Sequence, residues 1–444
     1  MPSGPSTQNS SVFDPQNAAI FQLSSDGDQA FLLENILSLS NNHGANTGEV
    51  LRIANQITPS NSEEATYQAY YPMAQAIDSL AQSIDPRIDP VGARENYFHA
   101  STYYRAASNY LVKDPSDPRL ISLWDQQISA FDKAVALLKP VPGEKFTVHA
   151  GNSSIGPYDI PAYFFKAHAD HHKRLPTLLV TTGYDGSMQE AYHSQCVQAL
   201  LRGLNCVVYE GPGQPSLLRY QNKTFIPDWW TATTPVVDYL CNRSDVDESK
   251  IVLMGISYGG TLAPRAASQE PRIAAVIQLD GLSSLQHDLR VQFPAELVEL
   301  YDAGKQVEFD EILIALGNNQ SQPIYDRYFI QQGLYAFGTK SPYDWFTRLG
   351  PIAVTKEVVQ GVGSRPVYIA KGEDDNLTLN ESDIAYKQFV SDRPSGANLT
   401  YFHLFPIALG AGEHCSLGAE TQVFTDIFKW LSRIWGGHAF ENLA

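Results

Sequence analysis

KIVLMGISYGGTLAPRAA, residues 250–267, joins an apolar run to a helical pattern through a serine placed between glycines. The run has the composition of a buried strand. A serine hydroxyl is a weak nucleophile without a neighbouring base, and it must stand clear of the sheet to meet a substrate. A sharp strand-to-helix turn exposes it, and such a turn leaves room only for Gly255 and Gly259 beside Ser257. The stretch therefore predicts a nucleophile at Ser257, and a structural glycine-rich turn is the alternative.

Similar short apolar runs precede and follow this one, and helical patterns separate them. They are TLLVTTG (177–183), NCVVYEG (205–211), AAVIQLDG (274–281) and PVYIAKGE (366–373). Upstream, KFTVHAG and YDIPAYFFKAH alternate like a hairpin. Short, wholly apolar strands between helices are typical of a mostly parallel sheet covered by helices on both faces, which binds ligands at the carboxyl ends of its strands. The predicted fold class is α/β.

The spacing of these patterns divides the chain. We expect a disordered tail over residues 1–15, a helical N-terminal (lid) domain over 16–142 and an α/β core over 143–444. Within the core, about eighty residues separate two of the strands, which is too many for one crossover helix. The segment 283–350 is therefore predicted to be an inserted helical cap.

Composition limits the partners. The net charge of −17, with no Lys/Arg cluster, disfavours nucleic acid and anionic membrane surfaces. No apolar run is long enough to cross a bilayer. The cysteines, 4 in all, form no CxxC pair and are too few for a disulfide scaffold, so a reducing, cytoplasmic location is expected. A small molecule is the expected partner, no cofactor or metal is required, and a homodimer is left open.

The partners of the serine should follow later strands, in the chain order Ser, acid, His. KGEDDN places Asp374 and Asp375 directly after a strand, and Asp375 is the predicted acid, with solvated loop carboxylates as the alternative. GAGEHCSLGAE places His414 on a late loop before the last helix, among small residues that leave its approach to Ser257 open. His414 is the predicted base.

An oxyanion formed in this reaction needs backbone N–H donors. The residue after the nucleophile, Tyr258, should supply one, and the turn after TLLVTTG should supply another. Tyr184 is the predicted second donor, while Gly183 and Asp185 remain alternatives.

Two other motifs are given structural interpretations. HADHH, with His168, Asp170, His171 and His172, resembles a metal cluster, but a solvated hairpin loop between two strands explains it better. EGPGQP lacks the Lys and Ser/Thr of a phosphate loop, and we interpret it as a turn at the pocket edge.

Several motifs together resemble one family. They are GYDGSMQEAY, YEGPGQ, DWWTATTPVVDYL, GISYGG, KGEDDN, GAGEHCSLGA and YYRAASNYL. The chain resembles the fungal secondary-metabolite α/β-hydrolases of the fusarin-cluster type, which are related to melanin-precursor chain-shortening hydrolases and to bacterial 2,6-dihydroxypseudooxynicotine hydrolase. The resemblance covers roughly residues 60–435. It implies an α/β-hydrolase core under a helical domain, and a triad of Ser257, Asp375 and His414. Where relatives commonly continue GPGQG, this chain has Pro215, so the pocket edge is expected to differ.

The leading hypothesis is a serine hydrolase that acts on a polyketide-derived ketone or ester, with cleavage of a carbon–carbon bond next to a ketone as one outcome. A second hypothesis keeps the serine but transfers or cyclises the acyl group. A third makes the fold a non-hydrolytic binding module, and the complete set of triad residues argues against it.

Overall fold

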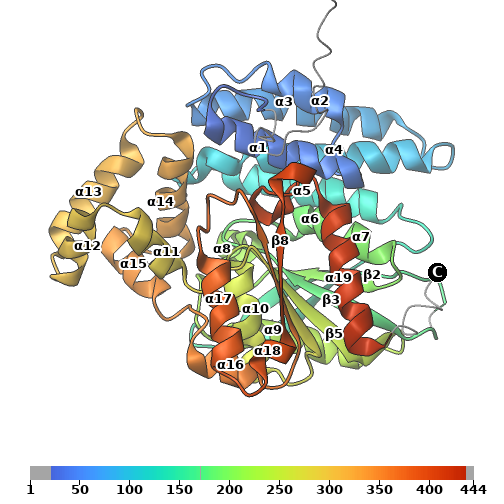
Figure 1. The fold of residues 1–444 in the computed structure, drawn as a ribbon. Helices are drawn as coiled ribbons and strands as arrows, with labels where there is room; N and C mark the ends of the chain where they lie inside the picture. Colours follow the sequence, from blue (N-terminus) through green and yellow to red (C-terminus); the bar gives the residue numbers. More distant parts are fainter. Residues whose placement is uncertain (1–21, 171, 437–444) are drawn as a thin grey trace, which may run out of the picture.

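The computed structural model describes residues 22–170 and 172–436, so the predicted N-terminal tail lies outside the described residues. An eight-stranded sheet in the order β1-β2-β4-β3-β5-β6-β7-β8 forms its centre (Figure 1). The strands are β1 (Glu144–Ala150), β2 (Tyr158–Phe165), β3 (Leu175–Thr181), β4 (Asn205–Tyr209), β5 (Val246–Ile256), β6 (Ala275–Leu279), β7 (Val367–Gly372) and β8 (Thr400–Phe405).

The pairing of the strands is mostly parallel. β2 is antiparallel to both of its neighbours, β1 and β4, and the strands from β4 to β8 pair in parallel. Alternate residues of each central strand enter different cores: Ile251 and Leu253 of β5 face one side, while Val252 and Met254 face the other. Both faces are buried, which explains why these strands are continuously apolar in the sequence. The α/β prediction is confirmed.

Helices cover both faces of the sheet. One face packs against α9 (Trp230–Cys241), α10 (Gly259–Gln269), α16 (Lys356–Val362) and α17 (Glu381–Ser391). The other face packs against α6 (Met188–Ala191), η4 (Tyr192–Cys196), α7 (Val197–Leu200) and α19 (Glu420–Trp435). The short helices α8 (Pro215–Gln221), α18 (Gly396–Leu399), η5 (Ile407–Leu409) and η6 (His414–Ser416) complete this part.

The N-terminal helices have a core of their own. They are α1 (Gly27–Ser38), η2 (Leu39–Asn42), α2 (Thr47–Ala54), α3 (Glu63–Ser83), α4 (Pro90–Ala107), η3 (Asn109–Lys113) and α5 (Arg119–Val135). Figure 1 shows them, in blue and cyan, lying across one end of the α/β part. Side chains such as Leu33, Tyr70 and Tyr103 fill the space between them.

The insertion between β6 and β7 is helical. It contains α11 (Leu285–Gln292), α12 (Ala295–Asp302), α13 (Gln306–Asn318), α14 (Ile324–Ala336) and α15 (Pro342–Leu349). An antiparallel bridge between Ser284 and Ala353 closes its base. Ile324 and Tyr328 of α14 belong to the core of the N-terminal helices, so the insertion touches that unit as well as the sheet.

Two details differ from the sequence-based interpretation. The loop that carries His168 and His172 is exposed, as expected, but it is not a hairpin because β4 lies between β2 and β3 in the sheet. Cys196 and Cys206 form a disulfide that joins η4 to β4. Spacing alone did not reveal this pair, because the fold brings the end of one helix onto the adjacent strand.

Within residues 22–170 and 172–436, no helix is both long enough and apolar enough to span a membrane.

Candidate active site

The turn between β5 and α10 holds Ser257 in a left-handed backbone conformation, with φ 56°. Such a φ is strained for a residue with a side chain and is found where the surrounding structure enforces it. The glycines make the turn possible because a Cβ on Gly255 would lie 2.0 Å from the carbonyl oxygen of Gly259, and a Cβ on Gly259 would lie 2.5 Å from that of Thr182. Ser257 is therefore presented on a sharp turn that side chains at these positions would prevent.

The structure brings the three predicted triad residues together from the ends of different strands. Nε2 of His414 lies 2.9 Å from Oγ of Ser257. Nδ1 of His414 lies 3.0 Å from Oδ2 of Asp375, an ion-pair distance, although the N–H is not well aligned on that oxygen. Contacts of this kind are often imperfect before a substrate binds. The arrangement can move a proton from Ser257 to His414.

The electrostatics of the pair favour a charged imidazole. Burial alone would lower the pKa of His414, but the Asp375 carboxylate beside it holds this pKa well above its usual value. For the carboxyl group of Asp375, burial alone would raise the pKa. His414 and the hydrogen-bond donors of Thr378 and Leu377 instead hold this pKa well below its usual range. Asp375 is thus a fixed negative charge that stabilises the imidazolium.

The neighbouring aspartate, Asp374, lies in different surroundings. Asp374 is half-exposed, and its N–H donates to the carbonyl oxygen of Gly412 at 2.8 Å. Asp375 is only 6% exposed and accepts from the hydroxyl of Thr378 at 2.5 Å. Of the two candidates, only Asp375 reaches His414.

Asp280, at the end of β6, was not identified from the sequence. Its carboxylate is fully buried and accepts from the N–H of Gly372 at 2.8 Å and from that of Cys415 at 2.6 Å. Burial and the nearby charge of Asp375 raise its pKa. Asp280 therefore ties the loop of the acid to the loop of the histidine. The signal in the sequence was an aspartate directly after a buried strand, in AAVIQLDG.

The predicted oxyanion donors lie on two segments that touch each other. A Cβ on Gly183 would lie 3.1 Å from Cβ of Ser257 and 3.4 Å from the backbone nitrogen of Tyr258. In the described part of the chain, the N–H groups of Tyr258 and of residues 183–185 donate no hydrogen bond. They are free to bind an oxyanion beside Ser257, and the geometry leaves Gly183, Tyr184 and Asp185 as alternatives for the second donor.

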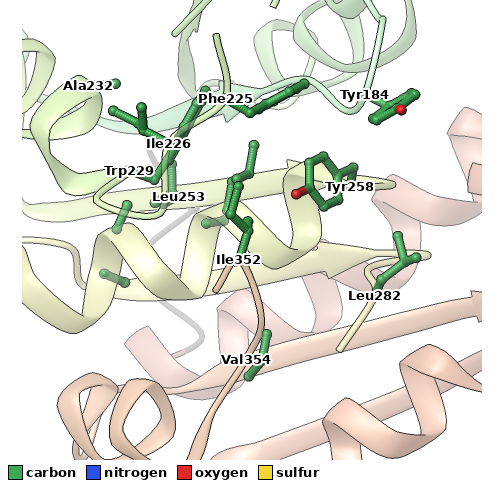
Figure 2. Packing of buried hydrophobic residues seen from close by; sticks show 14 of the residues in the cluster. Tyr184, Phe225, Ile226, Trp229, Ala232, Leu253, Tyr258, Leu282, Ile352 and Val354 are labelled. Atoms are coloured by element: carbon green, nitrogen blue, oxygen red, sulfur yellow. The ribbon is translucent and has the colours of Figure 1, made fainter. Parts of the chain in front are cut away.

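The side chains of Tyr184 and Tyr258 serve packing. Their rings meet edge to face with centroids 5.8 Å apart, and Phe225 meets Tyr258 in the same way at 5.2 Å. Figure 2 shows these rings converging next to the end of β5. Edge-to-face contacts stabilise such clusters and fix the backbone that carries them.

Gln214 of the EGPGQP turn was also missed as a contributor to this region. Its buried side-chain amide donates to the carbonyl oxygen of Thr182 at 2.7 Å and so holds the start of the 182–187 loop. Pro215 starts α8 and is buried, but it lines only a small neighbouring pocket and not the cavity in front of Ser257. Arg105 and Tyr328 line both spaces, so Pro215 lies beside the wall of the main cavity, and its effect on the pocket edge stays a prediction.

A cavity of about 620 Å³ lies in front of Ser257. The α/β part contributes Ser257 and His414 to its wall, α1 contributes Phe31, and the insertion contributes Leu289 and Phe329. A largely apolar chamber of this size can enclose a molecule of many heavy atoms.

The insertion also places an acid in this chamber. Asp288 of α11 is 2% exposed, and one of its carboxylate oxygens has no hydrogen-bond partner in the described structure. Burial, followed by the charge of Glu381, raises the pKa of Asp288 to about 7. Its carboxyl group can therefore carry a proton near neutral pH.

One group of side chains in the described residues has the spacing of a metal site. Atoms of Asp280, His414 and Cys415 lie within 4.8 Å of one another. His414 already contacts Ser257 and Asp375, and Asp280 already accepts from backbone N–H groups. The side chains of Asp280 and His414 are therefore already engaged in other contacts of the site.

Comparison with known proteins places this site in context. A family model described as X-Pro dipeptidyl-peptidase (S15 family) matches residues 161–325. Hydrolase LUC6 of Fusarium sp is 27% identical over 403 residues, which cover 88% of this chain and 93% of the relative. The 20-hydroxy-prefusarin hydrolase FUS2 of Gibberella moniliformis is 27% identical over 411 residues, covering 87% and 92%. Hydrolase acrC of Aspergillus aculeatus is 30% identical over 273 residues, covering 56% and 61%.

Among solved structures, that of 2,6-dihydroxy-pseudo-oxynicotine hydrolase superposes with a TM-score of 0.66 at 18% identity, covering 89% of this chain and 94% of the other. This match establishes a shared α/β-hydrolase fold. The relatives in sequence are hydrolases of fungal secondary metabolism. The chain is a hydrolase with the α/β-hydrolase fold.

Proposed function

We propose that the protein is a serine hydrolase that acts on a polyketide-derived ketone or ester by Ser-His-Asp catalysis. The observation that carries this proposal is the contact of 2.9 Å between Nε2 of His414 and Oγ of Ser257, inside a chamber of about 620 Å³. A hydroxyl paired with a base, beside a cavity that can receive the acyl group, is what acyl-enzyme chemistry requires.

In the proposed reaction, Oγ of Ser257 attacks the substrate carbonyl while Nε2 of His414 takes the hydroxyl proton. Asp375 stabilises the resulting imidazolium. The N–H of Tyr258, with one from residues 183–185, binds the oxyanion. When the oxyanion collapses, the bond to the leaving group breaks and His414 gives its proton to that leaving group. Water activated by His414 then hydrolyses the acyl-enzyme and restores Ser257.

Carbon–carbon cleavage is the form of this reaction that the chamber supports best. Breaking a bond next to a ketone leaves an enolate, whose carbon must receive a proton before it reattacks. The site offers His414 and, from the insertion, the carboxyl group of Asp288, whose pKa of about 7 lets it carry a proton. Acyl transfer or cyclisation remains the alternative, in which an acceptor molecule or an internal nucleophile of the substrate replaces water.

Product analysis on matched substrates tests this proposal. The purified protein is incubated with an aryl β-diketone and with the aryl ester of the same acyl group, and the products are identified by mass spectrometry in ordinary and ¹⁸O-labelled water. The proposal expects one labelled oxygen in the carboxylic acid from either substrate. Ser257→Ala should form no product, and Ser268→Ala, on the same helix but outside the site, should behave as the wild type. A third substrate, an aryl β-diketone that also carries a free hydroxyl group, tests the alternative: a cyclised product without the label would favour it.

A cytoplasmic location is proposed separately, and the Cys196–Cys206 bond gives it a test. Free thiols in the native host are blocked during lysis, and the state of both cysteines is then read by mass spectrometry. The proposal expects reduced thiols, because a reducing compartment opposes disulfides. A fully oxidised pair would point to an oxidising compartment.

A further inference from the structure

The loop Thr182–Ser187, named here the oxyanion loop, is held by helices from outside the α/β core. It follows β3 and lies against the turn of Ser257. Besides its bond to Gln214, it makes hydrogen bonds to α4 of the N-terminal helices and to α14 of the insertion. Both of these contacts converge on Asp185.

Arg105 of α4 makes the first contact. Its side chain is buried, and Nη2 donates to the carbonyl oxygen of Asp185 at 2.9 Å. Nη1 donates to Asn109, and Nε lies 3.4 Å from a carboxylate oxygen of Glu190. That same oxygen of Glu190 accepts from the N–H and the hydroxyl of Ser187, at the end of the oxyanion loop. The guanidinium therefore binds the loop directly at Asp185 and contacts its end at Ser187 only indirectly, through the ion pair with Glu190.

Tyr328 of α14 makes the second contact. Its hydroxyl donates to a carboxylate oxygen of Asp185, and its side chain is 4% exposed. The helix α14 is itself fixed to the N-terminal helices, because the fully buried Arg327 donates to Glu63 and to Asn61. Tyr328 therefore reaches Asp185 from a firmly attached helix.

We propose that Asp185 is a positioning residue through which both helical units set the oxyanion loop, an inference that rests on the proposed function. An oxyanion site works only when its N–H groups are held in place before the reaction. Arg105 fixes the peptide plane that follows Asp185, and Tyr328 fixes its side chain. The Tyr328 hydroxyl, as a hydrogen-bond donor to the Asp185 carboxylate, keeps that side chain in one orientation. The helical units thus complete the catalytic site as well as enclosing it.

The test compares two tyrosine variants that each lose one Tyr–Asp hydrogen bond. Tyr328→Phe removes the bond to Asp185. Tyr220→Phe is the control for the chemistry of the change, because its hydroxyl donates to Asp125 at 2.5 Å between α8 and α5, on an exposed side chain away from the cavity. The full-length variants are measured for kcat and KM on an aryl ester, and for affinity to a trifluoromethyl ketone, which forms a tetrahedral adduct with a serine and so mimics the transition state.

For Tyr328→Phe the proposal expects kcat to fall by about tenfold, less than for direct loss of an oxyanion donor, with KM changed by about twofold or less. Affinity for the trifluoromethyl ketone should fall in parallel with kcat/KM. Tyr220→Phe should match the wild type. Arg105→Lys, which keeps the charge but not the forked geometry, should also lower kcat. This variant tests the positioning role if Tyr328→Phe does not fold.

Two results would overturn the positioning role. One is an unchanged kcat with a raised KM in Tyr328→Phe, which would make Tyr328 a substrate contact. The other is an equal loss in Tyr220→Phe, which would indicate a general effect on stability. Ser257→Ala is measured alongside: if it is inactive while Tyr328→Phe is unaffected, only the positioning role fails, and if it stays active, the proposed function itself fails.

Discussion

Asp374 and Asp375 are neighbours in the sequence, yet their surroundings differ. Asp375 lies 3.0 Å from His414 and is buried, while Asp374 is half-exposed. We expect Asp375→Asn to lower kcat by about 10³- to 10⁴-fold, because an amide leaves His414 without its counter-charge and favours the wrong tautomer. Asp374→Asn should change kcat by less than about threefold, since a half-exposed charge has little effect on the site. Steady-state kinetics on one ester decide this, and the reverse ranking would move the acid to Asp374.

The pKa of His414 predicts the pH dependence. His414 must be neutral to accept the proton of Ser257, so the rate falls as pH drops through its pKa. Because Asp375 raises this pKa well above 6.5, the fall should begin above pH 6.5 and not only in acid. We expect kcat/KM, measured from pH 5 to 10, to rise through neutral pH. In Asp375→Asn the midpoint should move to lower pH. A flat profile between pH 5 and 8 would contradict the assignment of His414 as the base.

At the scale of elements, the strand-to-helix turn depends on a close approach of backbones. A Cβ on Gly259 would lie 2.5 Å from a carbonyl oxygen of Thr182, which belongs to the neighbouring segment after β3 and cannot move aside. Gly259→Val should therefore lower the free energy of unfolding by about 4 kcal/mol or more, the range of severe core clashes. Gly27→Val, at a glycine with open space around it, is the control. Denaturant unfolding measures both, and equal stability of the two variants would contradict this packing.

The elements also explain what could be predicted from the sequence. Ser257, Asp375 and His414 each follow a strand of the parallel sheet, and parallel strands bring such positions to one edge. Local sequence patterns were therefore enough to predict that these three residues lie at one edge of the sheet. Asp280 was missed because its role depends on backbone N–H groups of two distant loops.

Contacts between different elements account for the other omissions. The disulfide of Cys196 and the bond from Tyr328 to Asp185 join segments whose meeting depends on the packing of helices, and no local pattern encodes this packing.

At the scale of the whole molecule, the cavity takes its wall from the N-terminal helices, the α/β part and the insertion together. We expect the truncated chain 143–444 to be poorly soluble and inactive on bulky ketones, because removing the N-terminal helices exposes the apolar wall and removes Arg105 from Asp185. Turnover of a bulky β-diketone by the truncated and full-length proteins, at equal concentrations of folded protein, measures this. Equal rates would show that the helices neither enclose the substrate nor order the oxyanion loop.

In the proposed reaction, Ser257 is the residue that becomes acylated. A fluorophosphonate reacts with a serine hydroxyl only where a base activates it and an oxyanion site stabilises the adduct, so it tests the Ser257–His414 contact of 2.9 Å directly. The modified residue is located by peptide mass spectrometry after incubation of the folded, full-length protein. We predict stoichiometric labelling at Ser257, greatly slowed labelling in His414→Ala and none in Ser257→Ala. An unlabelled folded protein, or labelling at another residue, would contradict the account.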